Sequence, residues 1–299
     1  MERWEGVFSI LMTAYTKSGD IDEKAMRSSV NFVIENGVHG VVALGSVGEN
    51  PYLSHEEKRK VIDIVVDETN GRVPVVVGTG EFSTDMTIEM SRYAEDAGAD
   101  ALMICLPIYW KIREEDIIAH YSAVAHAVDK PIILYNFPST THLDMTPELI
   151  AKLAEIEGVI GIKESIGDIN HMRAVIENTD EKFSVFAGVS RLLLDILEIG
   201  GAGCFTPDAN IFPRVAVGIY SAYKQGDIKR ARALQNELND LTSLIGLGGP
   251  AFIAAIKELM NIIGIPIQSA VKSPLPSLTS EQKAMIRKHA ERKGLKRQL

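Results

Sequence analysis

The chain has 299 residues, 46% of them hydrophobic and 24% charged, so it can bury a large core and is not intrinsically disordered. Its net charge of -9 opposes binding to nucleic acid or anionic membranes, and no apolar run reaches the roughly 18 residues of a membrane span. The N-terminus lacks signal-peptide features, and Cys105 and Cys204 lie in predicted strands as free thiols, so we expect a cytoplasmic protein without nucleic-acid or membrane partners.

Short β-branched or apolar runs alternate with amphipathic stretches of helical length. The predicted strands begin near Val7, Val41, Val73, Ala101, Pro131, Val159, Phe183 and Ala202. Ser54-His55-Glu56-Glu57 is a capping box, and Thr146-Pro147-Glu148 places proline at a first helical position. Glycines such as Gly98, and pairs such as Asn70-Gly71, supply the left-handed residue that ends a helix.

Strands that are apolar throughout, alternating with helices, predict an α/β fold in the form of a (β/α)8 TIM barrel. A doubly wound open sheet is the alternative. Beyond Asn210 the strand signals stop, and helical patterns follow at about 213–224, 227–245, 250–263 and 280–294. We therefore expect a barrel over residues 1–224 and a C-terminal helical domain over residues 225–299.

Two polar residues end neighbouring strands of the predicted barrel. Lys163 lies near the end of the apolar run 159–164, and Tyr135 near the end of the run 131–136. A lysine buried by a strand is paired, reaches water along the protein surface, or exists as a neutral amine, which is a nucleophile for carbonyl carbon. The loops after barrel strands form the active face, so both side chains are expected at one mouth, with the tyrosine as a proton carrier.

Other candidate sites give weaker signals. The turn Gly45-Ser46-Val47-Gly48 after the second strand offers backbone N–H groups to a carboxylate, although glycines at strand ends also serve purely structural turns. The seven histidines show no metal-ligand spacing, so no metal is expected. Gly78-Thr79-Gly80 is too short for a dinucleotide-binding fingerprint and is interpreted as a turn.

Three motifs together resemble a known family. Gly45-Ser46-Val47-Gly48-Glu49, Tyr135-Asn136-Phe137-Pro138 and Gly161-Ile162-Lys163-Glu164 occur in the order and spacing of the dihydrodipicolinate synthase and N-acetylneuraminate lyase family of pyruvate-dependent class I aldolases. The resemblance runs from about Gly6 to the C-terminal helices. It implies that Lys163 forms a Schiff base with pyruvate or another 2-keto acid and that Tyr135 relays protons.

The same resemblance implies further roles. The Ser46 hydroxyl would lie between Tyr135 and a second tyrosine, and the N–H groups of Ser46 and Val47 would bind the pyruvate carboxylate. Tyr109 matches a tyrosine that reaches into a neighbouring subunit's site, in a homotetramer built as a dimer of dimers. No cofactor is expected, because the imine with the substrate is the electron sink. Gly188, Phe205 and Thr140 complete the expected substrate-binding residues.

Departures from the family pattern bear on the substrate. Thr140 stands where the synthase has an arginine that clamps the carboxylate of aspartate semialdehyde, Val47 replaces a common hydroxyl residue, and Ile108 replaces an aromatic residue. Losing a charge-assisted bidentate contact makes aspartate semialdehyde a poor substrate. The segment 107–111 with 135–138 instead resembles bacterial aldolases that act on 2-keto-3-deoxy sugar acids such as 2-keto-3-deoxygluconate.

The sequence therefore predicts a Schiff-base lyase that reversibly cleaves a 2-keto-3-deoxy sugar acid to pyruvate and an aldehyde. One alternative is dihydrodipicolinate synthase itself, with Arg113 or Arg191 supplying the missing cation. A dehydratase acting through the same imine is a third possibility. From another class, a non-catalytic sensor could bind a 2-keto acid on an enzyme scaffold, although the intact pair Lys163 and Tyr135 argues against it.

Overall fold

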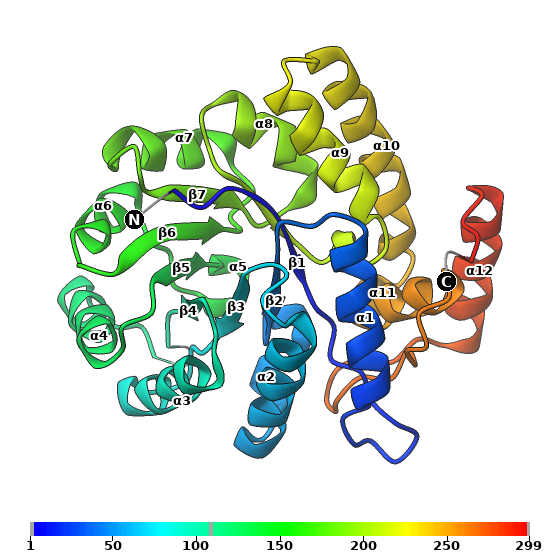
Figure 1. The fold of residues 1–299 in the computed structure, drawn as a ribbon, viewed down its shortest axis with the longest axis horizontal. Coiled ribbons are helices and arrows are strands. Elements are labelled where there is room, and N and C mark those ends of the chain that lie inside the picture. Colours follow the sequence, from blue (N-terminus) through cyan, green and yellow to red (C-terminus); the bar gives the residue numbers. More distant parts are fainter. Residues whose placement is uncertain (1–2, 108–109, 298–299) are drawn as a thin grey trace.

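A computed structural model describes residues 3–107 and 110–297 of the chain, which form a closed parallel barrel ringed by helices (Figure 1). Each strand pairs with its neighbours in sequence, and the first strand also pairs with the last. This confirms the predicted (β/α)8 barrel over the open sheet. The strands are β1 (Gly6–Ile10), β2 (Gly40–Ala43), β3 (Val75–Gly78), β4 (Ala101–Cys105), β5 (Ile132–Asn136), β6 (Val159–Glu164), β7 (Ser184–Ala187) and β8 (Gly203–Thr206).

Helices connect successive strands and continue beyond the barrel. The helices up to β8 are α1 (Glu23–Glu35), α2 (His55–Thr69), α3 (Thr84–Ala97), α4 (Glu114–Ala127), α5 (Pro138–Thr141), α6 (Pro147–Ala154), α7 (Ile169–Asn178) and α8 (Leu193–Glu198). After β8 come α9 (Pro213–Lys224), α10 (Ile228–Gly246), α11 (Phe252–Ile262) and α12 (Ser280–Arg292). These last four helices confirm the helical patterns expected there.

The predicted start and stop signals act where the sequence placed them. At α2 the Ser54 side chain accepts from the Glu57 N–H while the Glu57 side chain accepts from the Ser54 N–H, which completes the capping box. At α6 the Thr146 side chain accepts from the Leu149 N–H, and Pro147 takes the first helical position. At the end of α2 the left-handed residue is Asn70 itself (φ 47°), an amino acid that tolerates this conformation.

Aromatic side chains pack against one another inside the barrel. The ring centroid of Phe205 lies 4.7 Å from both Phe8 and Phe186, and all three residues are buried. Such a packed interior leaves the strand ends as the place for chemistry. Cys105 and Cys204, on β4 and β8, are free thiols, as the sequence predicted.

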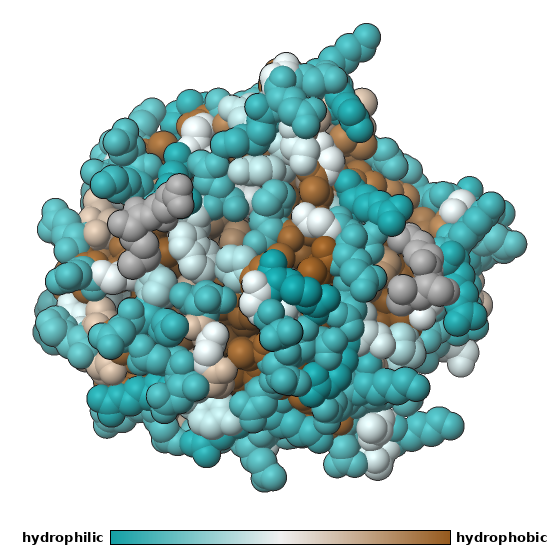
Figure 2. All heavy atoms as spheres, viewed as in Figure 1, coloured by the Kyte–Doolittle hydropathy of each residue, from teal (hydrophilic) through white to brown (hydrophobic). Residues whose placement is uncertain are grey.

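The C-terminal helices pack on one side of the barrel. Figure 1 shows α10 beside α9, and α11 on the side where α1 lies. Figure 2 shows a mainly hydrophilic surface in the same view, with hydrophobic side chains visible toward the middle of the face. Within the described ranges no single helix has the length and apolar character to cross a bilayer; only the pair Ile228–Gly246 and Gly249–Ile262, bent by 114°, passes on length and composition.

Candidate active site

The structure brings Lys163 and Tyr135 together at the ends of β6 and β5. The two residues are register partners on adjacent strands, and the Lys163 Nζ lies 3.6 Å from the centre of the Tyr135 ring. Lys163 is only 2% exposed. A lysine head group in water, the alternative left open by the sequence, is therefore wrong for this residue.

Burial controls the charge of this lysine. Removal from water lowers the pKa of Lys163 to about 7, because desolvation disfavours the ammonium form. A smaller opposing effect comes from the neighbouring thiol of Cys105. A lysine with a pKa near 7 is about half neutral at physiological pH, so it is available as a nucleophile.

The Tyr135 hydroxyl sits among serine hydroxyls. Its oxygen lies 3.2 Å from the Ser46 Oγ, and either group can donate. Burial raises the pKa of Tyr135, while hydrogen bonds to Ser46 and Ser165 oppose that rise. The phenol therefore stays protonated at neutral pH and has partners through which a proton can move. Ser165 directly follows the motif that ends in Glu164, and the sequence assigned it no separate role.

Gly188 shapes the space around Ser165. A Cβ at position 188 would lie 1.9 Å from the Ser165 Oγ, so a side chain there would displace this hydroxyl from the Tyr135 side of the mouth. The Gly188 N–H donates to the Glu164 carbonyl oxygen at 2.6 Å. The structure thus places Gly188 beside the strand-end loop of Lys163, and its contact with substrate remains a prediction.

The turn after β2 is a short 3-10 helix, η1 (Ser46–Gly48). It packs tightly, since a Cβ at Gly48 would meet the Leu11 carbonyl oxygen at 3.1 Å and a Cβ at Gly78 would meet the Leu44 carbonyl oxygen at 2.1 Å. The first N–H groups of a helical turn have no partner within that turn. Those of Ser46 and Val47 therefore suit an anion, and their binding of a carboxylate stays a prediction.

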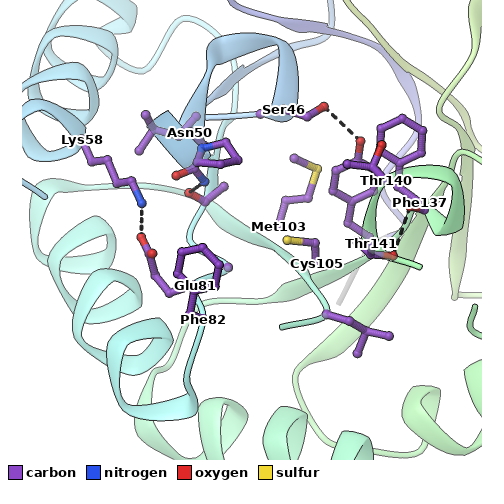
Figure 3. A pocket seen from close by; sticks show the side chains of 17 residues that line it. Ser46, Asn50, Lys58, Glu81, Phe82, Met103, Cys105, Phe137, Thr140 and Thr141 are labelled. Atoms are coloured by element: carbon purple, nitrogen blue, oxygen red, sulfur yellow. Dashed lines mark hydrogen bonds and ion pairs between the residues drawn. The ribbon is translucent and has the colours of Figure 1, made fainter. Parts of the chain in front are cut away.

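A cavity of about 90 Å³ opens beside these groups (Figure 3). One water molecule needs about 10–15 Å³ of such space, so the cavity holds several. In Figure 3, Ser46 and Thr140 lie on one side of the cavity and Lys58 and Glu81 on the other; Tyr135 also lines it. Of the described lining residues, Lys58 alone is cationic, and it is paired with Glu81. The side chains facing Thr140 thus carry no unpaired positive charge.

A polar network fixes the strand ends from outside the barrel. Glu164, the residue after Lys163, is fully buried and accepts from the Asn136 Nδ2 at 3.0 Å and the Ile166 N–H at 2.9 Å. The His171 Nε2 lies 3.1 Å from the same carboxylate, and this contact is the main cause of its raised pKa. Because side chains alternate along a strand, anchoring Glu164 orients Lys163 to the other side.

Not every predicted residue joins this cluster. Phe205 has no exposed surface and its ring packs against Phe8 and Phe186 in the core, so contact of this residue with substrate stays a prediction. Arg113 is on the surface and paired with Asp116, which removes it as a cation for the cavity. Tyr109 and Ile108 lie outside the described residues.

Within residues 3–107 and 110–297, no group of three or more His, Cys, Asp or Glu side chains could hold a metal ion. His120 is buried, and its Nδ1 contacts the Thr84 hydroxyl at 2.9 Å. Burial lowers the pKa of His120 to about 4, so this histidine is neutral.

Comparisons with known proteins agree with the motifs. The profile of the dihydrodipicolinate synthetase family matches residues 3–293. The 4-hydroxy-tetrahydrodipicolinate synthase of Methanopyrus kandleri is 42% identical, over 97% of this chain and 97% of that protein. The probable 2-dehydro-3-deoxy-D-pentonate aldolase YjhH of Escherichia coli is 33% identical over 96% of both. The crystal structure of Escherichia coli YagE in complex with pyruvate superposes with a TM-score of 0.94, at 32% identity, covering 97% of this chain and 99% of that one.

Proposed function

This chain belongs to the dihydrodipicolinate synthetase family of pyruvate-dependent class I aldolases and lyases, and we propose that it reversibly cleaves a 2-keto-3-deoxy sugar acid to pyruvate and an aldehyde. The observation that carries the chemistry is the buried amine of Lys163, which lies 3.6 Å from the Tyr135 ring centre. The N–H groups of Ser46 and Val47 hold the carboxylate of the keto acid.

The proposed reaction starts with attack of the Lys163 amine on the C2 carbonyl carbon. The carbinol oxygen takes one proton from the attacking amine nitrogen and a second from Tyr135 and leaves as water, so a protonated imine forms beside the resulting phenolate. The phenolate takes the C4 hydroxyl proton as the C3–C4 bond breaks, and the bonding electron pair moves into the iminium. The aldehyde leaves an enamine on Lys163. Protonation of the enamine at C3 by Tyr135, followed by hydrolysis, releases pyruvate and restores both groups.

The neutral character of the cavity wall supports a sugar-acid substrate. Thr140 lines the cavity, and its hydroxyl can hydrogen-bond a polyol but cannot neutralise a second carboxylate. The cationic lining residue Lys58 already has a carboxylate partner, Glu81. YjhH and YagE, which are named as aldolases of 2-dehydro-3-deoxy sugar acids, are each 33% identical to this chain.

Condensation of pyruvate with aspartate semialdehyde is the second candidate. The 42% identity to the Methanopyrus kandleri synthase favours it. Against it stands Thr140 at the position where the resemblance expects an arginine. Arg191 is the cation that this alternative requires; it lies beside Gly167, in the loop after Lys163, because its Nη2 would be 2.8 Å from a Cβ at position 167.

Two measurements separate the candidates. Pyruvate release is assayed over a panel of 2-keto-3-deoxy acids, and condensation of pyruvate is assayed with glyceraldehyde and with aspartate semialdehyde. We expect cleavage of 2-keto-3-deoxygluconate-like acids and weak use of aspartate semialdehyde. Thr140→Arg should shift kcat/KM toward aspartate semialdehyde by roughly one to two decades, the scale of one charged hydrogen bond. Wild-type preference for aspartate semialdehyde over every neutral aldehyde would replace the sugar-acid reaction with the synthase reaction.

The remaining expectations stay proposals. We propose a homotetramer in which Tyr109 completes a neighbour's site, a cytoplasmic location, and catalysis without a metal or organic cofactor. Mixing Tyr109→Phe with Lys163→Ala tests the first of these, because hybrid interfaces would contain one intact composite site. A fully active monomer would contradict it.

A further inference from the structure

Glu49, directly after the carboxylate-binding turn, is held in an unusual position. Its side chain is fully buried and its backbone is left-handed (φ 65°), a conformation that non-glycine residues rarely adopt. Its N–H donates to the Ser46 carbonyl oxygen at 3.1 Å, which closes η1. Glu49 is therefore part of the turn, and any force on its carboxylate acts on that turn.

The Glu49 carboxylate is bound from the C-terminal region, about 200 residues away along the sequence. One oxygen pairs with the Lys257 Nζ of α11, and both side chains are fully buried. The other oxygen accepts from the Lys272 N–H at 2.7 Å. Lys257 also donates to the Ala270 carbonyl oxygen at 2.7 Å, so it ties α11 and the following segment to the same carboxylate.

The opposite side of the turn is anchored on the barrel. The Thr13 Oγ1, just after β1, donates to the Gly48 carbonyl oxygen at 2.5 Å. The Tyr15 ring lies 4.5 Å from the Lys257 Nζ, so its face further stabilises the buried ammonium. The turn is thus held between the end of β1 and the C-terminal region.

A buried ion pair carries a large desolvation cost, and apolar side chains of similar volume often stabilise a contact between two buried segments equally well. Unlike an apolar contact, the ion pair fixes the orientation of the Glu49 carboxylate, because each of its oxygens accepts a hydrogen bond from a different segment. We propose that Glu49 and Lys257 are positioning residues, which hold η1 in the conformation whose N–H groups bind the substrate carboxylate. Through them the C-terminal region sets the affinity of the enzyme for keto acids. This inference rests on the proposed function of the turn.

The test compares two ketones that differ in their carboxylate. Pyruvate and acetone both form an imine with an amine, but only pyruvate uses the η1 N–H groups. Each is trapped on Lys163 with borohydride over a range of concentrations, and the labelled protein is quantified by mass. The main variant is the double replacement Glu49→Gln with Lys257→Met, which removes both charges together and leaves neither unpaired.

We expect the half-saturating pyruvate concentration to rise about tenfold, as for loss of well-aligned hydrogen bonds to a charged group, while acetone trapping changes less than about twofold. Glu49→Gln alone keeps the side-chain shape but leaves the buried Lys257 ammonium without its carboxylate, so it should raise this concentration at least as much as the double variant does. Arg287→Met is the matched control, because it removes the Arg287–Glu258 ion pair between α12 and α11 without touching η1, and it should change neither ketone.

An unchanged pyruvate affinity in Glu49→Gln and in the double variant would overturn the inference. Equal loss for pyruvate and acetone would also overturn it, since that result means a general loosening around Lys163. If the wild type traps no pyruvate, the proposed function fails and the inference with it. If the wild type traps pyruvate but the variants show unchanged pyruvate affinity or equal loss for both ketones, the positioning role is refuted and the proposed function is not.

Discussion

Two buried lysines in this molecule have opposite surroundings. Lys163, at the barrel mouth, is 2% exposed and lies against the Tyr135 ring, and burial lowers its pKa to about 7. Lys257, where α11 meets the barrel, is fully buried but paired with Glu49. Burial lowers the pKa of Lys257 as well, and there the carboxylate opposes the change.

The difference shows what makes a buried lysine reactive. Desolvation acts on both side chains, so burial alone does not create a nucleophile. What distinguishes Lys163 is that no carboxylate contributes to its pKa shift. Lys58 belongs with Lys257, because it is buried at the cavity wall and paired with Glu81. We therefore expect Lys163 to be the one reactive amine among these three buried lysines.

The largest expected effect is on imine formation with pyruvate, which Lys163 should undergo and Lys257 should not. Borohydride with pyruvate should add the reduced pyruvyl mass to Lys163, and Lys163→Ala should abolish both the label and turnover, because no other amine forms the imine. Lys257→Met should keep a label on Lys163. Peptide mapping by mass spectrometry measures this. A label that persists in Lys163→Ala would contradict the assignment.

The next effect tests the group against which Lys163 lies. Tyr135→Phe keeps the ring beside the amine but removes the hydroxyl that contacts Ser46 at 3.2 Å. We expect kcat to fall by about 10² to 10⁴, the range of a general acid–base group, while the fold survives. Steady-state kinetics with circular dichroism measure both. A fall below about fivefold would mean that another group carries the proton.

Replacing Lys163 and replacing Lys257 by methionine should change the free energy of unfolding in opposite directions. Lys163→Met removes a group whose pKa falls from 10.5 to about 7 on folding, so stability at pH 7 should rise by up to about 4 kcal/mol. Lys257→Met leaves the Glu49 carboxylate buried without its ammonium partner, and stability should fall by about 3 to 5 kcal/mol. Denaturant unfolding at pH 7 measures both free energies.

The stability gain has a defined pH dependence. Between about pH 7 and pH 10.5 the unfolded wild type binds a proton that the folded state lacks, so wild-type stability rises with pH in this window. The advantage of Lys163→Met should therefore shrink as pH rises through the window. If Lys163→Met and Lys257→Met change the free energy of unfolding at pH 7 in the same direction, the two lysines do not differ as described.

The sequence predicted the fold and the adjacency of Lys163 and Tyr135 because both depend on local patterns. Alternating apolar runs and capping residues determine the strands and helices, and strand order then places Tyr135 beside Lys163. The contacts of Glu49 with Lys257 join residues far apart in sequence, and no local pattern signals them. Phe205 was assigned to the substrate site from the resemblance, whereas its ring packs inside the barrel.

The smallest expected effect comes from giving Lys163 the kind of partner that Lys257 has. Cys105, at the end of β4, is the register partner of Tyr135, and its thiol already influences the pKa of Lys163. Cys105→Asp should place a carboxylate near the amine and raise the pKa of Lys163 by about one unit or more. At pH 7 a rise of about one unit lowers the neutral fraction of the amine about fivefold, so the rate of pyruvate trapping should fall by about that factor or more.

The pH profile distinguishes this charge effect from a change in shape. In the wild type, trapping should rise about tenfold per pH unit below pH 7 and level off above it, because only the neutral amine attacks. In Cys105→Asp the same profile should move to higher pH and recover its full rate there, whereas Cys105→Asn, which has a similar volume and no charge, should keep the wild-type midpoint. If both variants lose rate equally at every pH, the loss comes from the cavity shape. The absence of a carboxylate would then not be what separates Lys163 from Lys257.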